Sequence, residues 1–229
     1  MKKSSILAAS ILLLAGVIAR VPAYADSVLY SDLGSGGSIY SNYGAWTVAG
    51  SASGYGMSET NASLFTVVGS GSLSVSQIDL AVSNIFNSLD TFNASIWTDN
   101  AGLPGTQVTG AFWGLSTTTN YGTCCSLVTT TGITGVTLTG GQQYFMVLDP
   151  VSLSDASWNG WNLNNQGVSG LMVQNGFSVG TTYPLGAFDV LGDTSVPEPC
   201  PLLLILSGLV ALFGVNEASR RGYFGRVLG

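Results

Sequence analysis

Apolar and polar residues alternate along most of this chain with a period of two, which is the pattern of a half-buried β-strand. Ten segments between residues 26 and 192 follow it and are predicted to be strands: 27–31, 45–49, 64–68, 73–82, 91–98, 108–113, 135–138, 143–148, 170–174 and 187–191. Glycine, asparagine, serine and proline separate them, as in antiparallel sheets. Residues 26–192 are therefore predicted to form one all-β domain, an antiparallel β-sandwich of jelly-roll-like architecture.

One predicted strand, 73–82, contains an irregularity. Its apolar positions are odd-numbered up to Val75 and even-numbered from Ile78 onwards, so the alternation changes phase at Ser76 and Gln77. A regular strand would then turn half of its apolar side chains to water. We predict a β-bulge or a corner at this point, because either keeps both halves facing the core.

The N-terminal segment has a different pattern. Two lysines precede an apolar run over 6–18, which is followed by the small residues Ala23 and Ala25. This order predicts a secretory signal peptide over residues 1–25, removed by signal peptidase before Asp26. The alternative, an uncleaved anchor, is disfavoured by the short apolar run.

The C-terminal segment combines a proline motif, an apolar run and arginines. The run, 201–215, predicts a short transmembrane helix, although roughly 15 residues is below the usual 17 to 25. Basic residues after such a helix remain on the cytoplasmic side. The motif consists of Val196, Pro197, Glu198 and Pro199, and the basic end, 220–229, contains Arg220, Arg221 and Arg226.

This tail, residues 193–229, resembles the PEP-CTERM sorting signal of Gram-negative bacteria that make exopolysaccharide. The resemblance implies that an exosortase, a membrane-embedded cysteine protease, recognises the Pro-Glu-Pro motif and removes the tail. The protein would then be an inner-membrane-anchored precursor that reaches the cell surface or the extracellular space. The tail departs from the family pattern at residues 216–219, which separate the helix from its arginines. An ordinary C-terminal anchor is the alternative.

Two segments of the predicted β domain carry a second resemblance. Residues 96–105 form a strand entering a tight turn, whose Asn-x-Gly and Pro-Gly residues supply left-handed and fixed-φ positions. Residues 138–147 have the order strand, turn, strand. Together the xDNxGxPG loop and the L-T-x-G-x-x-Y strand look like bacterial exported choice-of-anchor domains. That resemblance implies an exported β domain with interchangeable C-terminal anchors, and it brings no catalytic residues.

Charge is distributed unevenly along the chain and restricts its chemistry. All six basic residues lie in the two ends, and between Asp26 and Val196 there are ten acidic residues and no lysine, arginine or histidine. Nucleic-acid binding is excluded because it requires basic residues that neutralise phosphates. Without histidine there is no imidazole base, no Ser–His or Cys–His pair and no histidine-bound metal. We predict that the protein is not an enzyme and uses no cofactor.

The composition favours a structural or interaction role. Charged residues make up only 8% of the chain, and serine, threonine and asparagine fill most polar positions. Such a surface can hydrogen-bond a hydrated polysaccharide, so the protein is predicted to belong to the cell surface or extracellular matrix, linked to exopolysaccharide or biofilm. A carbohydrate-binding module is the first alternative, and a carboxylate-dependent glycoside hydrolase is the second.

A few residues are candidates for binding. Trp158 and Trp161 could present indoles to a sugar if a turn at Asn159-Gly160 brought them to one edge; a strand would point them to opposite sides, and the other interpretation is that they fill the core. Asp99 and Asn100 are weak candidates for calcium, which prefers oxygen ligands, and are otherwise solvated turn residues.

Cys124 and Cys125 are adjacent in the sequence. Cysteines in an exported protein are expected to oxidise. The alternatives are a bridge through a small ring, two free thiols or an intermolecular bridge. Without a histidine to activate a thiolate, neither is predicted to be catalytic.

Overall fold

The computed structural model describes residues 26–86 and 90–193. The predicted signal peptide and, after Asp193, the predicted sorting tail lie outside them. Within these ranges the regular elements are all strands: β1 (Asp26–Ser31), β2 (Ala45–Ala49), β3 (Asn61–Thr66), β4 (Ser72–Leu80), β5 (Val82–Asn84), β6 (Asp90–Asp99), β7 (Pro104–Thr117), β8 (Val128–Thr131), β9 (Thr137–Thr139), β10 (Gln143–Asp149), β11 (Trp158–Asn162), β12 (Ser169–Gln174), β13 (Phe177–Pro184) and β14 (Phe188–Asp193). Nowhere in 26–86 or 90–193 is there a helix long and apolar enough to cross a membrane.

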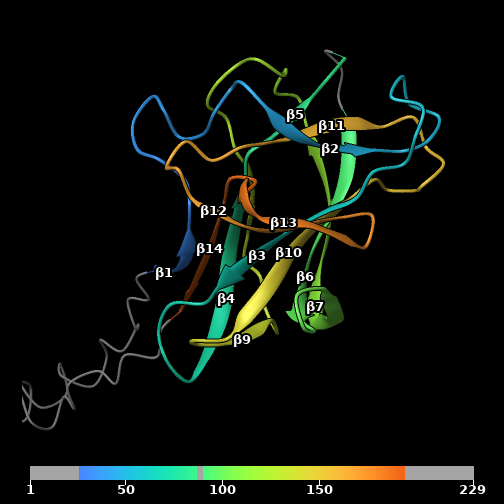
Figure 1. Cartoon of the computed structure of the whole chain (residues 1–229). Coiled ribbons are helices and arrows are strands. Elements are labelled where there is room, and N and C mark those ends of the chain that lie inside the picture. The colour runs from blue at the N-terminus through green and yellow to red at the C-terminus, as the bar shows by residue number, and fades with distance from the viewer. Residues whose placement is uncertain (1–25, 87–89, 194–229) are drawn as a thin grey trace, which may run out of the picture. The chain divides into compact units, whose positions relative to one another are not determined.

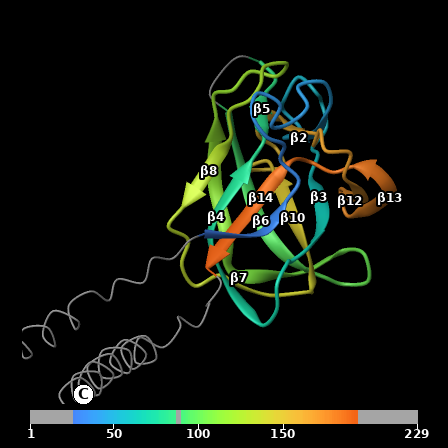
Figure 2. The same ribbon diagram turned by 90° about the vertical axis from the view of Figure 1, so that its left-hand side faces the viewer.

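The strands form three antiparallel sheets. A five-stranded sheet has the order β1-β14-β4-β8, with β9 also paired to β4, and a six-stranded sheet has the order β13-β12-β3-β10-β6-β7. A three-stranded sheet, β2-β11-β5, lies across one end of the two larger ones (Figure 1). The view at right angles shows β14 and β4 in front of β10 and β6, so the two larger sheets form separate layers (Figure 2). The predicted all-β, antiparallel, sandwich-like fold is confirmed.

The main core lies between the two larger sheets. Phe65 of β3 contacts aromatic rings from both layers, with centroids 5.2 Å from Tyr30, 5.4 Å from Phe188 and 6.1 Å from Tyr144. Burying such side chains contributes roughly 1.5–3 kcal/mol each. Further fully buried members of this core are Leu29, Ile78, Leu80, Phe92, Ile96, Met146, Leu148 and Val190.

A second, smaller apolar cluster lies on the outer face of the six-stranded sheet. It contains Ala62, Phe145, Val147 and Val173, with Leu64, Trp97 and Leu171 packed against them. Strand β10 supplies both clusters because its successive side chains point to opposite faces. This sheet therefore has apolar side chains on both faces. The candidate site lies next to the outer cluster.

The predicted irregularity in segment 73–82 is confirmed as a bulge. Gln77 pairs with Leu191 and Val75 pairs with Gly192, so Ser76 is an extra residue on β4. Both Val75 and Ile78 are buried in the main core as a result. The chain then leaves the five-stranded sheet at Ala81 and enters the three-stranded sheet as β5.

Three strands, β8, β11 and β13, were not predicted from the sequence, and each omission has a physical explanation. β13 has no buried residue along its length, and β8 is a short, threonine-rich segment that has none either. β11 has the opposite character, since the asparagines at 159 and 162 are fully buried. Asn162 donates hydrogen bonds to the Ala81 carbonyl (3.0 Å) and the Ser83 hydroxyl (2.7 Å). Polar residues that bind the backbone in this way break the apolar–polar alternation.

Candidate functional site

The two tryptophans proposed as a sugar platform lie in the regular strand β11, which contradicts the turn that would bring them to one edge. Trp161 is fully buried in the main core, where its indole Nε1 donates to the Ala187 carbonyl at 3.1 Å. Its ring centroid is 5.7 Å from that of Phe188. The interpretation of Trp161 as a ligand-binding residue is therefore wrong, because no face of its ring reaches solvent.

Trp158 is half-buried and belongs to an aromatic group at the end of the three-stranded sheet. Its ring centroid lies 4.9 Å from that of Phe86 and 5.7 Å from that of Tyr55. Its backbone amide donates to the Asp90 carboxylate at 2.6 Å. A Cβ placed on Gly54 would lie 3.2 Å from the indole. Trp158 thus anchors the loop after β2, and Phe86 and Tyr55 cover part of its ring.

A cavity of about 380 Å³ lies instead at one end of the six-stranded sheet, lined by Thr66, Asp99, Gly141, Gln142 and Gln143. Ligand cavities in proteins commonly have volumes from roughly 300 Å³ upwards. Of the lining residues only Asp99 carries a charge. The other side chains are a hydroxyl and two amides, so the cavity offers hydrogen-bond donors and acceptors with a single negative charge.

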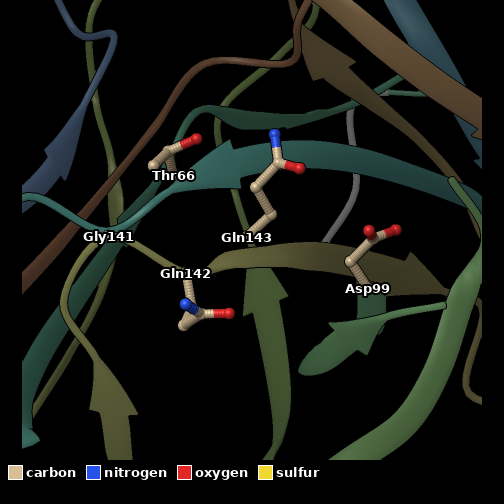
Figure 3. Close-up of a pocket in the computed structure, with 5 residues that line it drawn as sticks. All are labelled: Thr66, Asp99, Gly141, Gln142 and Gln143. Atoms are coloured by element: carbon tan, nitrogen blue, oxygen red, sulfur yellow. The ribbon is translucent and has the colours of Figure 1, made fainter. Parts of the chain in front are cut away.

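The strand register explains how residues far apart in the sequence meet there. Gln143 of β10 pairs with Thr66 of β3, and Tyr144 pairs with Thr98 of β6, which places Asp99 opposite Gln143. Opposite residues of antiparallel strands point to the same face. We call Thr66, Gln143 and Asp99 the polar row; Figure 3 shows the side chains of Gln143 and Asp99 extending to the same side of the sheet, and that of Gln142 to the other.

An apolar row follows the polar row on the same face. Two residues further along β10, Phe145 pairs with Leu64 on one side and with Trp97 on the other. These three residues belong to the outer apolar cluster. The indole Nε1 of Trp97 donates to the Ser95 hydroxyl at 2.8 Å, which fixes the ring on the sheet. The cavity therefore adjoins an aromatic and aliphatic strip.

The hairpin between β6 and β7 holds Asp99 in place. Asn100 and Leu103 exchange backbone hydrogen bonds of 2.8 and 3.3 Å around Ala101 and Gly102, which both have positive φ. The predicted tight turn is confirmed. One carboxylate oxygen of Asp99 accepts a hydrogen bond from the Gly102 amide at 2.8 Å, and this bond stabilises the turn. Within residues 26–86 and 90–193 no three acidic or cysteine side chains gather as metal ligands, and the calcium candidates Asp99 and Asn100 have no partners of that kind.

The turn before β10 holds the two glutamines in place. The amide of Gly141 donates to the Val67 carbonyl at 2.8 Å, and the amide of Val67 donates to the Gln142 carbonyl at 3.0 Å. Gly140 packs directly on the neighbouring loop, because a Cβ on it would lie 2.4 Å from the Ser70 nitrogen. This close approach requires glycine.

Replacing Gly140 by alanine is expected to cost about 1–3 kcal/mol of the free energy of unfolding, because the loop at Ser70 must move. Urea denaturation measures the effect. Gly37→Ala is the matched control, since no atom lies within 4 Å of the added Cβ and the φ of Gly37 is not in the left-handed region. It should change the stability by less than about 0.5 kcal/mol. Equal effects of the two substitutions would contradict the packing.

Several carboxylates outside the cavity are partly or fully buried in the fold, and burial affects the pKa of each of them. Asp32 is buried, where it accepts the Phe188 amide at 2.7 Å and the Tyr30 hydroxyl at 3.2 Å. Burial raises the pKa of Asp32 to about 7 despite these hydrogen bonds, and the charge of Asp189 acts in the same direction as burial. Burial also raises the pKa of Asp149 to about 6. For Asp155, hydrogen bonds from Ser157 and neighbouring amides outweigh burial and lower the pKa.

Cys124 and Cys125 form a disulfide with each other, which is the first of the three alternatives that the sequence left open. Cys125 packs against a small apolar group that includes Tyr40, Ala81 and Ala187. The Sγ of Cys124 lies 3.7 Å from the Tyr40 carbonyl oxygen. The bridge thus lies where the loop before β8 contacts the loop after β1.

No family model matches the chain, and no curated protein matches it in sequence. The signal-peptide residues Ala23 and Ala25, the motif 196–199 and the arginines of the basic end lie outside the described residues. Of the cavity residues, sequence reasoning singled out only Asp99. It missed Thr66, Gln142 and Gln143, because only the strand register brings them together.

Proposed function

We propose that the protein is an exported, exosortase-sorted component of the cell surface or extracellular matrix, with a structural or interaction role linked to exopolysaccharide. Signal peptidase would remove residues 1–25, the tail would hold the precursor in the inner membrane, and the exosortase would act at the Pro-Glu-Pro motif. The observation that supports a non-catalytic role is that acidic residues of the described body form hydrogen bonds to its loops and backbone. The body also contains no lysine, arginine or histidine.

Five of these ten carboxylates form hydrogen bonds that support loops and backbone. Asp90 accepts the Trp158 amide, Asp99 the Gly102 amide and Asp32 the Phe188 amide. Glu59 accepts the Asn175 side chain at 2.9 Å. Asp155 accepts the Ser152 and Ser157 amides, both at 2.9 Å. Carboxylates engaged in this way serve the architecture.

We further infer that the sandwich is a jelly roll. Eight strands support this inference, in the orders β1-β14-β4-β9 and β3-β10-β6-β7, so that the first strand pairs with the last. The β12–β13 hairpin and the three-stranded sheet are additions to that arrangement. Jelly rolls include lectin domains, which is compatible with a protein that contacts polysaccharide.

The hydrolase alternative has less support. Glycoside hydrolysis needs two carboxyl groups on either side of the scissile bond, and the cavity contains one, Asp99. Asp79 and Asp189 pair across β4 and β14, but Asp79 is buried and bonded to Gln77 and Thr129. Both carboxylate oxygens of Asp79 are therefore already hydrogen-bonded within the sheet.

Replacing Pro197, Glu198 and Pro199 together by alanine tests the sorting proposal. Because the protease would lose its recognition motif, we expect the protein to persist as a larger, membrane-retained form. Immunoblots of membrane and extracellular fractions measure this. Replacing Ser195 by alanine, next to the motif, is the control and should leave processing unchanged. A triple variant of unchanged size and location would refute exosortase processing.

A further inference from the structure

We propose that the cavity at the polar row is a saccharide-binding site, specific for uncharged, hydroxyl-rich glycans. The inference deepens the proposed matrix role by naming a ligand class and a site. It rests on that role for its biological setting only, since the site lies in the described body and does not involve the sorting tail.

The hydrogen-bonding groups of the cavity match those of a sugar. A sugar hydroxyl donates one hydrogen bond and accepts others, so it is best met by groups that can do both. The amide of Gln143 and the hydroxyl of Thr66 each donate and accept. Asp99 accepts only; one of its oxygens is taken by the Gly102 amide, and the carboxylate keeps further lone pairs for hydroxyl donors. The exposed side chains of Thr66 and Gln143 are in direct register, so both face one ligand.

The apolar row supplies the other half of sugar recognition. The C–H faces of a pyranose ring pack on apolar and aromatic surfaces. Phe145, Leu64 and Trp97 follow the polar row on the same face of the sheet. Phe145 is fully buried, so the half-buried Leu64 and Trp97 are the side chains that a ligand would contact. A ligand that fills the cavity and extends along the sheet would pass from hydrogen-bonding groups onto this strip. A small ion or a purely polar solute would use only the first part.

Charge decides which glycans can bind. Asp99 is the only ionisable group lining the cavity, and residues 26–193 contain no cationic side chain. A uronate or sulfate group would therefore approach a carboxylate without any lysine or arginine to offset the repulsion. Neutral hexoses and their polymers avoid this repulsion. The site should therefore discriminate against acidic polysaccharides even of the same backbone.

The chain also fixes both walls of the cavity before any ligand arrives. The hairpin turn at Ala101-Gly102 positions Asp99, and the turn at Gly140-Gly141 positions Gln142. Both turns are closed by backbone hydrogen bonds of 2.8 to 3.3 Å. A preformed site loses less conformational entropy on binding, which matters for sugars because their individual hydrogen bonds contribute little net free energy.

The test is binding by the full-length protein, purified in detergent, to an array of neutral and uronate-containing glycans, followed by titration of the strongest neutral ligand. We expect binding to neutral glycans only. Gln143→Ala and Thr66→Val should each weaken it about tenfold, equivalent to about 1.4 kcal/mol. Gln166→Ala, an exposed amide in the loop after β11 and outside the cavity, is the matched control and should bind like the wild type.

Three results would overturn the proposal: no neutral glycan bound at millimolar concentration, equal binding of acidic glycans, or cavity variants that bind like the wild type. Thermal unfolding of each variant shows whether it is folded, and Thr66→Ser is a second, milder variant that should retain binding. Failure of this test leaves processing of the Pro-Glu-Pro motif unaffected. Failure of the sorting test likewise leaves binding by purified protein unaffected.

Discussion

Replacing Trp161 by alanine is expected to lower the free energy of unfolding by about 3–5 kcal/mol, the usual cost of removing a large aromatic side chain from a core. The indole is fully buried, packs against Phe188 and lies on the backbone at Gly186, where a Cβ would be 2.3 Å from its ring. Its removal leaves a void that this backbone cannot easily fill. The Ala187 carbonyl still accepts the Ala81 amide at 3.1 Å, so most of the loss is packing.

Trp158→Ala is the matched control for that experiment. It removes the same side chain three residues earlier in β11, where the ring is half-buried against Tyr55 and Phe86. Urea denaturation of both variants should give a clearly smaller loss for Trp158→Ala. Equal losses would contradict the division between a core tryptophan and a loop anchor. Because Trp161 lies in the core and not at the cavity, a loss of sugar binding by Trp161→Ala would be an indirect effect of unfolding.

The second large effect is a decrease in stability as the pH rises from 4 to 8. Asp32 has an ordinary pKa of 3.8, and burial raises it to about 7 in the folded protein. Between these values the folded state binds more protons than the unfolded state, so the free energy of unfolding decreases with pH. The contribution is fully present below about pH 4 and is lost as the pH passes 7. For Asp32 alone it is on the order of 4 kcal/mol.

Other groups modify this pH dependence. The pKa of Asp149 and that of Asp189 are also raised, chiefly by burial, and act in the same sense. Asp155 acts in the opposite sense, because its lowered pKa stabilises the fold at neutral pH and that contribution is lost in acid. With no lysine, arginine or histidine in the body, no cation offsets the buried carboxylates.

Urea denaturation at intervals between pH 4 and pH 8 measures the slope for the wild type and Asp32→Asn. The asparagine oxygen can still accept the Phe188 amide, but the side chain no longer titrates. The variant should therefore lose the Asp32 share of the pH dependence, about 4 kcal/mol, and keep the shares of Asp149 and Asp189. Asp26→Asn, an exposed carboxylate in β1, is the control and should keep it. A wild-type stability that rises with pH, or an unchanged slope in Asp32→Asn, would contradict the assignment.

Local patterns in the sequence predicted a large part of this fold. Alternation located β2 with its bounds, and the phase change in segment 73–82 located the bulge at Ser76. Such predictions succeed because the side-chain period of a strand is two, so the residues that must be buried are visible in the sequence itself. The same approach failed for β13, which buries no face, and for β11, whose buried asparagines are polar.

The candidate site required information that no local pattern contains. Thr66, Asp99 and Gln143 are distant in the chain, and only the pairing of β3, β10 and β6 places them in one row. The burial of Trp158 and Trp161 also could not be read from a local pattern, since Trp161 is fully buried and Trp158, in the same strand, is half-buried. The sequence by itself determined the acidic body and most of the strands, and it predicts the signals at both ends. Tertiary packing decided which side chains are buried and which share a cavity, because burial and register depend on contacts between strands remote in sequence.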